Sequence, residues 1–352
     1  MHFYPGRKIT IACILIAVVV VLLGAFTRLS HAGLGCPDWP TCYGHLWVPN
    51  SAAEIATANL SFAHTPVETD KTWPEQIHRI FASSLGVFII ALVVACYRNR
   101  REQLQPLKLS YLLLVLVIVQ GLFGMWTVTL KLWPQVVTAH LLGGFSTLAL
   151  LWLMLQRLSL YSWSQTGQSA RTITSVSRLA LFSLLVVIIQ IFLGGWISSN
   201  YAALACPDLP MCQDQWFPTA NFSQGFNFLQ HIGPNYLGGL LDNEARIAIH
   251  ISHRIGAIIT SIVLLLLAWR LWHLAPGKPQ RWSLILIAVL ALQIGLGLSN
   301  VYWSLPLTVA VIHNGIGALL LLVLVTINHR LWGLDRIMKK IIERSENSKV
   351  VL

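Results

Sequence analysis

The chain has 352 residues, of which 55% are hydrophobic and only 11% are charged, and its formal net charge at pH 7 is +11. With a mean hydropathy of +0.66, this composition excludes an ordinary soluble domain and predicts a protein embedded in a lipid bilayer. The positive charge lies mostly in short connections between apolar runs, so it gives no support to nucleic-acid binding.

Apolar runs long enough to cross the hydrocarbon core, which takes about 20 helical residues, occur in eight places. We expect transmembrane helices near 9–28, 76–97, 107–130, 135–156, 176–199, 247–270, 281–301 and 307–329. The first run follows Arg7 and Lys8, as in a cleaved signal peptide or a lipoprotein signal ending at Cys36, but it is longer than a usual signal-peptide core. We therefore interpret it as the first permanent span of an all-α integral membrane protein.

Lys and Arg concentrate on the cytoplasmic side of membrane proteins, and their distribution predicts the topology. If both termini lie in the cytoplasm, the outer segments hold only a few of the 24 Lys and Arg residues, namely Arg28, Lys71, Lys131 and Arg246. The sequence therefore predicts a multi-pass protein with both termini inside.

The chain contains an internal duplication. The segment Gly35–Cys42 recurs as Ala205–Cys212, and each copy follows an odd-numbered span. The same register continues downstream: Glu75–Ile80 matches His250–Ile255, Gln120–Gly124 matches Gln293–Gly297, and His140 matches His313. We expect two tandem four-helix bundles, 1–165 and 166–352, that point the same way and are related by a pseudo-two-fold axis along the membrane normal.

Four histidines lie near the predicted outer ends of the even-numbered spans, at His78, His140, His253 and His313. An ionisable side chain in hydrocarbon costs several kcal/mol unless it is paired, ligated or facing a cavity. Facing helices of a bundle can aim two imidazoles at each other. Pairs suit axial ligation of haem iron, whereas a tetrahedral zinc site needs three or four ligands. We predict two bis-histidine haem sites toward the outer face, although any one histidine alone is also compatible with a hydrogen bond to a neighbouring helix.

The residues around these histidines differ between the halves. Glu75 lies three residues before His78, on the same helix face, and corresponds to His250 in the second half. A carboxylate beside a haem can move protons or stabilise a cation, and the alternative is a helix-start glutamate that interacts with the dipole. We expect the substrate site in the first half and an electron-carrying cofactor in the second.

Arg79 and Arg254 directly follow a histidine in each half. A buried arginine beside a haem suits a propionate, so both are candidate propionate contacts, with interfacial anchoring as the alternative.

Each long outer loop carries a cysteine pair with five intervening residues. Because disulfides persist on the oxidising side of the membrane, we expect the bonds Cys36–Cys42 and Cys206–Cys212, either structural or exchangeable. Metal binding by two thiolates is the weaker alternative.

These features together resemble the haem A synthase family, the membrane enzymes of cytochrome oxidase cofactor biosynthesis, in its bacterial type with outer-loop cysteine pairs. The resemblance covers nearly the whole chain. It implies that the C8 methyl group of haem O is oxidised to a formyl group by two successive hydroxylations and a dehydration, which gives haem A for terminal oxidases. His78 and His140 would bracket haem O, His253 and His313 would be the axial ligands of a haem b cofactor, and Glu75 would be the catalytic carboxylate.

The resemblance also implies a setting. It places the protein among the lipids of the bacterial plasma membrane, with a haem O synthase, the protohaem farnesyltransferase, as a partner, and it is compatible with an oligomer. Two other classes fit parts of the pattern: a di-haem b-type cytochrome that only transfers electrons, and a transporter with a parallel repeat. The difference between Glu75 and His250, together with the shared depth of both sites, favours the enzyme.

Overall fold

The computed structural model describes residues 6–102, 105–159, 163 and 168–349, with side chains up to residue 333. Eight of its helices are long and apolar enough to cross a membrane, and the described residues form no β-strand, so the prediction of an all-α membrane protein is confirmed. These helices are α1 (Arg7–Leu29), α3 (Thr69–Arg98), α4 (Leu107–Thr129), α5 (Pro134–Arg157), α6 (Ala170–Ser199), α8 (Asn243–Leu274), α9 (Lys278–Tyr302) and α10 (Leu307–Lys349).

Helix ends extend beyond the apolar runs that predict them. The helix α3 begins at Thr69 and α8 at Asn243, several residues before the predicted starts, because helical hydrogen bonding continues into polar segments where hydropathy carries no signal. The outer loops also contain two short helices, α2 (Ala52–Ser61) and α7 (Phe222–Gly225). The helix α2 begins with a capping box formed by Ser51 and Glu54, which stabilises its first turn.

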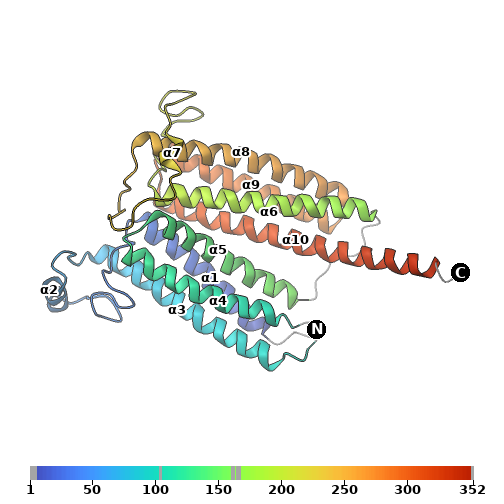
Figure 1. The fold of residues 1–352 in the computed structure, drawn as a ribbon, viewed down its shortest axis with the longest axis horizontal. Helices are drawn as coiled ribbons and strands as arrows, with labels where there is room; N and C mark the ends of the chain where they lie inside the picture. Colours follow the sequence, from blue (N-terminus) through green and yellow to red (C-terminus); the bar gives the residue numbers. More distant parts are fainter. Residues whose placement is uncertain (1–5, 103–104, 160–162, 164–167, 350–352) are drawn as a thin grey trace.

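The eight helices form two groups of four (Figure 1). In the first group α1 packs on α3, α3 on α4, α4 on α5, and α5 back on α1; α6, α8, α9 and α10 follow the same order. The groups meet where α1 and α5 pack against α6 and α10. The pseudo-two-fold relation stays a prediction, and the boundary predicted at residues 165 and 166 lies outside the described residues.

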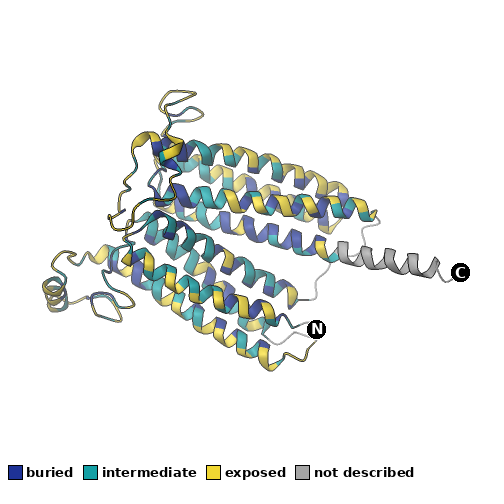
Figure 2. Cartoon of the chain, in the orientation of Figure 1, coloured by how far each residue is buried: buried dark blue, intermediate teal, exposed yellow. Residues whose placement is uncertain are grey.

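Burial distinguishes the helices at this junction from those at the periphery (Figure 2). In the most apolar window of each helix, 56% of the residues of α10 are buried, against 11% for α4 and 17% for α9. Side chains of α10 belong to both hydrophobic cores, with Leu321 in the first and Leu324 in the second. The outward faces of α4 and α9 are therefore left for lipid.

Polar side chains join the two groups along the whole junction. Thr138 and Ser199 are 3.0 Å apart near the loop end, and the indole N–H of Trp152 donates to the hydroxyl of Thr326 at 2.8 Å. Interhelical hydrogen bonds of this kind hold membrane helices together. The long loops with α2 and α7 lie at one end of the molecule, and both chain ends lie at the other (Figure 1).

Candidate functional site

The first histidine pair lies between α3 and α5. The ring centroids of His78 and His140 are 6.4 Å apart, and their planes are nearly perpendicular at 88°. The Nδ1 atoms of both rings are buried and have no hydrogen-bond partner among the described residues. Two half-buried imidazoles, each with a buried Nδ1 that has no partner among the described residues, are therefore brought together by α3 and α5.

Each of the four histidine rings lies against a glycine of the preceding long helix. A Cβ added at Gly24 would lie 3.0 Å from Cε1 of His78, and one at Gly194 would lie 3.3 Å from Cε1 of His253. Gly124 and Gly297 stand in the same relation to His140 and His313, at 3.6 and 3.2 Å. Larger side chains would displace the rings. The sequence analysis did not single out these glycines, although the repeat register places Gly24 opposite Gly194 and Gly124 opposite Gly297.

Two glutamine side chains lie within hydrogen-bond distance of the second histidine pair. Gln190 of α6 lies 3.1 Å from Nδ1 of His253 through its amide nitrogen, which also donates to the carbonyl oxygen of His253 at 3.0 Å. The amide nitrogen of Gln293 lies 3.3 Å from Nε2 of His313. The sequence places Gln293 in the repeat but assigns no role to it or to Gln190, because the contact of a glutamine with another helix is not visible in the sequence.

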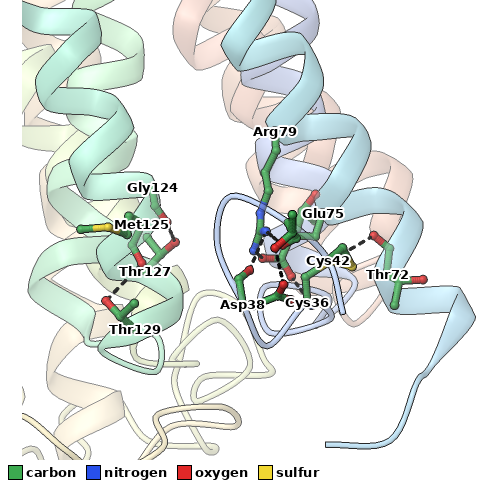
Figure 3. A network of polar contacts seen from close by, with 12 residues as sticks. Cys36, Asp38, Cys42, Thr72, Glu75, Arg79, Gly124, Met125, Thr127 and Thr129 are labelled. Atoms are coloured by element: carbon green, nitrogen blue, oxygen red, sulfur yellow. Dashed lines mark hydrogen bonds and ion pairs between the residues drawn. A yellow bond between two sulfur atoms is a disulfide. The ribbon is translucent and has the colours of Figure 1, made fainter. Parts of the chain in front are cut away.

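Glu75 and Arg79 connect α3 to the first disulfide loop (Figure 3). Glu75 is buried, and its carboxylate accepts the backbone N–H of Cys36 at 2.9 Å and forms an ion pair with Arg79. Arg79 also donates to the carbonyl oxygens of Asp38 and Thr41, both at 2.8 Å. One buried ion pair thus holds the loop against the helix that carries His78.

The second half repeats this attachment with different residues. Arg254 donates to the carbonyl oxygens of Met211, Cys206 and Asp208 at 2.7 to 2.9 Å. In place of Glu75, Nδ1 of His250 lies 3.0 Å from the carbonyl oxygen of Ala202. Both arginines therefore contact a disulfide loop, and their contact with haem propionates stays a prediction.

Each loop is closed by a disulfide, Cys36–Cys42 in the first and Cys206–Cys212 in the second. In the first loop the Asp38 carboxylate accepts the backbone N–H groups of Tyr43 at 2.6 Å and Gly44 at 2.9 Å, and the hydroxyl of Thr41. Partial burial opposes ionisation of Asp38, but the hydrogen bonds from Thr41, Gly44 and Tyr43 outweigh it and lower the pKa of the carboxyl. Asp208 accepts the equivalent backbone N–H groups in the second loop.

The remaining metal-binding side chains do not cluster. Within the part of the chain that the structure describes, no three His, Cys, Asp or Glu side chains gather as a multidentate metal site requires. Cys13 and Cys96 are buried in the first core and form no disulfide.

Comparison with known proteins identifies the family. The model of the COX15-CtaA family, described as a cytochrome oxidase assembly protein, matches residues 7–325. The chain belongs to this family. The match runs from the start of α1 into α10, so it includes both histidine pairs, both disulfide loops and Glu75, and the resemblance predicted from the sequence is confirmed.

Relatives in the COX15-CtaA family carry a shared name, "Heme A synthase". The protein of Shewanella oneidensis is 48% identical over 318 residues, which cover 90% of this chain and 93% of the relative. That of Halalkalibacterium halodurans is 25% identical over 302 residues, covering 84% and 87%, and that of Chelativorans sp. is 26% identical over 334 residues, covering 89% and 88%. This family member is therefore similar to haem A synthases along nearly its whole length.

Proposed function

We propose that this chain is a haem A synthase, an enzyme that converts haem O into haem A. The observation that carries the proposal is the pair of half-buried histidines in each half, packed against glycines, in a chain 48% identical to a relative named for this activity. The reaction is an oxidation of the C8 methyl group. Two successive hydroxylations replace C–H bonds by C–O bonds, and loss of water from the resulting diol leaves the formyl group.

The histidines fit the role of iron ligands. Neutral imidazole nitrogen is a common axial ligand of haem iron, and Nδ1 of His78, His140 and His313 is buried without a hydrogen-bond partner among the described residues. We assign His78 and His140 of the first half, 1–165, to the substrate haem O. His253 and His313 of the second half, 166–352, would hold a haem b cofactor, which supplies electron transfer when bound.

Glu75 is the residue that distinguishes the two halves chemically. Its carboxylate is fixed by the N–H of Cys36 and by Arg79, three residues before His78 on the same helix. A buried carboxylate held in this way can accept a proton or stabilise positive charge at the oxidised methyl group. The imidazole of His250 at the equivalent position offers no negative charge, which supports placing the chemistry in the first half.

The setting of the reaction follows from the topology that we propose. The Lys and Arg distribution supports cytoplasmic termini, and both chain ends lie opposite the long loops (Figure 1). The haem sites would then lie toward the outer face of the bacterial plasma membrane. A haem O synthase would supply the substrate, and Arg79 and Arg254, at the base of the disulfide loops, are the candidate propionate contacts.

Pigment analysis tests the proposed function. The full chain is expressed with a haem O source, and extracted haems are separated by chromatography, with cells that lack the chain as the control. Haem A or its hydroxymethyl precursor, present only with the chain, supports the enzyme. Protohaem as the sole pigment in both sites would instead favour the electron-carrying cytochrome.

A further inference from the structure

A glutamine and a glycine act together beside His253. The amide of Gln190 contacts both Nδ1 and the backbone carbonyl of this histidine, at 3.1 and 3.0 Å. The same amide lies directly against Gly256, one turn further along α8, where an added Cβ would collide with Oε1 of Gln190. Gly256 therefore provides the space in which the Gln190 amide reaches the ring.

Both members of this pair are replaced in the first half. The repeat register places Val20 opposite Gln190 and Phe81 opposite Gly256. This register is supported by Gly24 and Gly194, which it also pairs, because each lies against the equivalent histidine of its own half. Valine has no polar side-chain atom, so at this position only the backbone can form a hydrogen bond with His78. The first half therefore lacks both the glutamine amide and the glycine that makes room for it.

The other two helices of each half carry a glutamine in both halves, and the halves differ there in its hydrogen bond to the histidine. Gln293 and Gln120 occupy equivalent positions, and the amide nitrogen of Gln293 lies 3.3 Å from His313. The amide of Gln120 lies against Gly143, three residues after His140, just as Gln190 lies against Gly256, but the described residues include no hydrogen bond between Gln120 and His140. In the second half each histidine has a side-chain amide within hydrogen-bond distance, and among the described residues of the first half no such hydrogen bond is found.

A side chain that holds the second nitrogen of a ligating imidazole fixes the orientation of the ring. Such partners typically change metal affinity by about 10- to 100-fold. A carboxamide offers a donor and an acceptor, so it can pair with Nδ1 in either tautomer of the ring. An imidazole without this support must be ordered each time a ligand binds, which weakens binding and favours release.

We propose that Gln190, seated against Gly256, is a positioning residue that orients His253 and makes the second haem site retain its haem, whereas Val20 and Phe81 leave the first site able to exchange haem. This inference rests on the proposed function for the identity of the two haems. It explains how duplicated sites with the same ligands can serve a resident cofactor in one half and a substrate that enters and leaves in the other.

Haem transfer from the purified full-length protein tests the inference. The protein is loaded with protohaem in detergent and mixed with excess apomyoglobin, and the loss of its low-spin absorbance is followed in time. We expect Gln190→Val to release second-site haem about 10- to 100-fold faster and to shift its midpoint potential. The matched control is Ile189→Val on the same helix, at a side chain that is 58% exposed, and it should release haem at the native rate.

A conservative variant separates positioning from packing. Gln190→Glu keeps the length of the side chain and an acceptor for Nδ1–H, so we expect retention close to native. Its midpoint potential should be lower, because a carboxylate acceptor makes the imidazole a stronger donor to iron. Native release and native potential in both Gln190 variants would overturn the inference.

The reciprocal variant tests the first site independently of how well Gln190→Val folds. Val20→Gln combined with Phe81→Gly, made in a His313→Ala background so that first-site haem is observed, should slow haem release relative to that background alone. An unchanged rate would contradict the inference. Failure of the proposed function is distinguishable, because it is measured by the absence of haem A among extracted pigments, whereas this inference is measured by the rate of haem release.

Discussion

His31 and Tyr201 occupy equivalent positions in the two repeats and stack on each other, with ring centroids 5.4 Å apart and planes 11° from parallel. Each follows the first helix of its half in a left-handed turn, with φ of 58° and 55°. Arg28 lies 4.1 Å over the Tyr201 ring and donates to the carbonyl of Ser198. Equivalent residues meet only near an axis that relates their repeats, so this pair marks where the predicted pseudo-two-fold axis would run.

The first prediction concerns Glu75. We expect Glu75→Ala to keep haem bound and to lose formyl formation, because the carboxylate is not an iron ligand but lies on the same helix face as His78. Extracted pigments, separated by chromatography, measure the product. Normal haem A from this variant would remove Glu75 from the mechanism.

Glu75→Gln separates the charge of Glu75 from its contact with the loop, because the amide still offers an oxygen to the N–H of Cys36. Loss of haem A in both variants assigns the defect to the missing negative charge. Product in Glu75→Gln but not in Glu75→Ala assigns it to the position of the loop.

The second prediction assigns the resident haem. His253→Ala and His313→Ala should remove the low-spin b-type absorbance, because each deletes one axial ligand of the proposed haem b. His78→Ala and His140→Ala should retain that absorbance and lose haem A formation. Reduced-minus-oxidised spectra of purified variants provide the measurement, and unchanged spectra in the first two would count against their role as ligands.

How far the sequence predicts this structure depends on the type of signal. Apolar runs predict the eight spans well, because a backbone in lipid must satisfy its own hydrogen bonds and so forms helices. The ends at Thr69 and Asn243 are missed, because polar helical turns carry no hydropathy signal. The helix α2 was also missed, although the spacing of Ser51 and Glu54 is typical of a capping box.

Some residues of the candidate site can be predicted from the sequence and others cannot. The four histidines are visible because ionisable residues are costly in apolar helices. The role of Gln190 cannot be predicted from the sequence, because it depends on a contact with another helix. The contacts of Arg79 with Asp38 and Thr41 depend on the path of a loop, which periodicity does not predict.

The third prediction compares the arginines beneath the two disulfide loops. Arg79→Ala leaves Glu75 buried without its cation, which costs about 3–5 kcal/mol for a buried ion pair; the two side chains are 12% and 6% exposed. Arg254→Ala leaves only carbonyl oxygens unpaired and should cost less, about 1–3 kcal/mol. Thermal unfolding in detergent measures both, with the exposed Arg98→Ala as a control. Equal losses would mean that the Glu75 charge adds nothing to the attachment of the loop.

The fourth prediction is a pH dependence of the first disulfide loop. Although partial burial opposes it, hydrogen bonds from Thr41, Gly44 and Tyr43 lower the pKa of Asp38. A carboxyl whose pKa is lowered by folding stabilises the folded loop above its ordinary pKa of about 3.9, and this stabilisation is lost as the pH falls through the lowered value. Reduction of Cys36–Cys42 by a phosphine should therefore accelerate below about pH 4.

Asp38→Asn should accelerate this reduction already at neutral pH, because the amide carries no negative charge. It should also remove the further acceleration at low pH, because the amide has no charge that acid could neutralise. Asp208→Asn, which changes the second loop, is the matched control and should leave the rate at Cys36–Cys42 unchanged. An acid acceleration that survives in Asp38→Asn would assign the effect to another group.

The fifth prediction tests whether the two histidine pairs are separate sites. A Cβ at Gly24 would lie 3.0 Å from the ring of His78, and one at Gly194 would lie 3.3 Å from the ring of His253, so valine at either position should displace that ring. Gly24→Val should lower haem O occupancy and haem A formation while the b-type spectrum remains. Gly194→Val should reduce the b-type spectrum while the first site still binds haem O. The control is Gly121→Val, whose Cβ would meet no atom within 4 Å. If both variants lost the same pigment to the same extent, the pairs would form one coupled site.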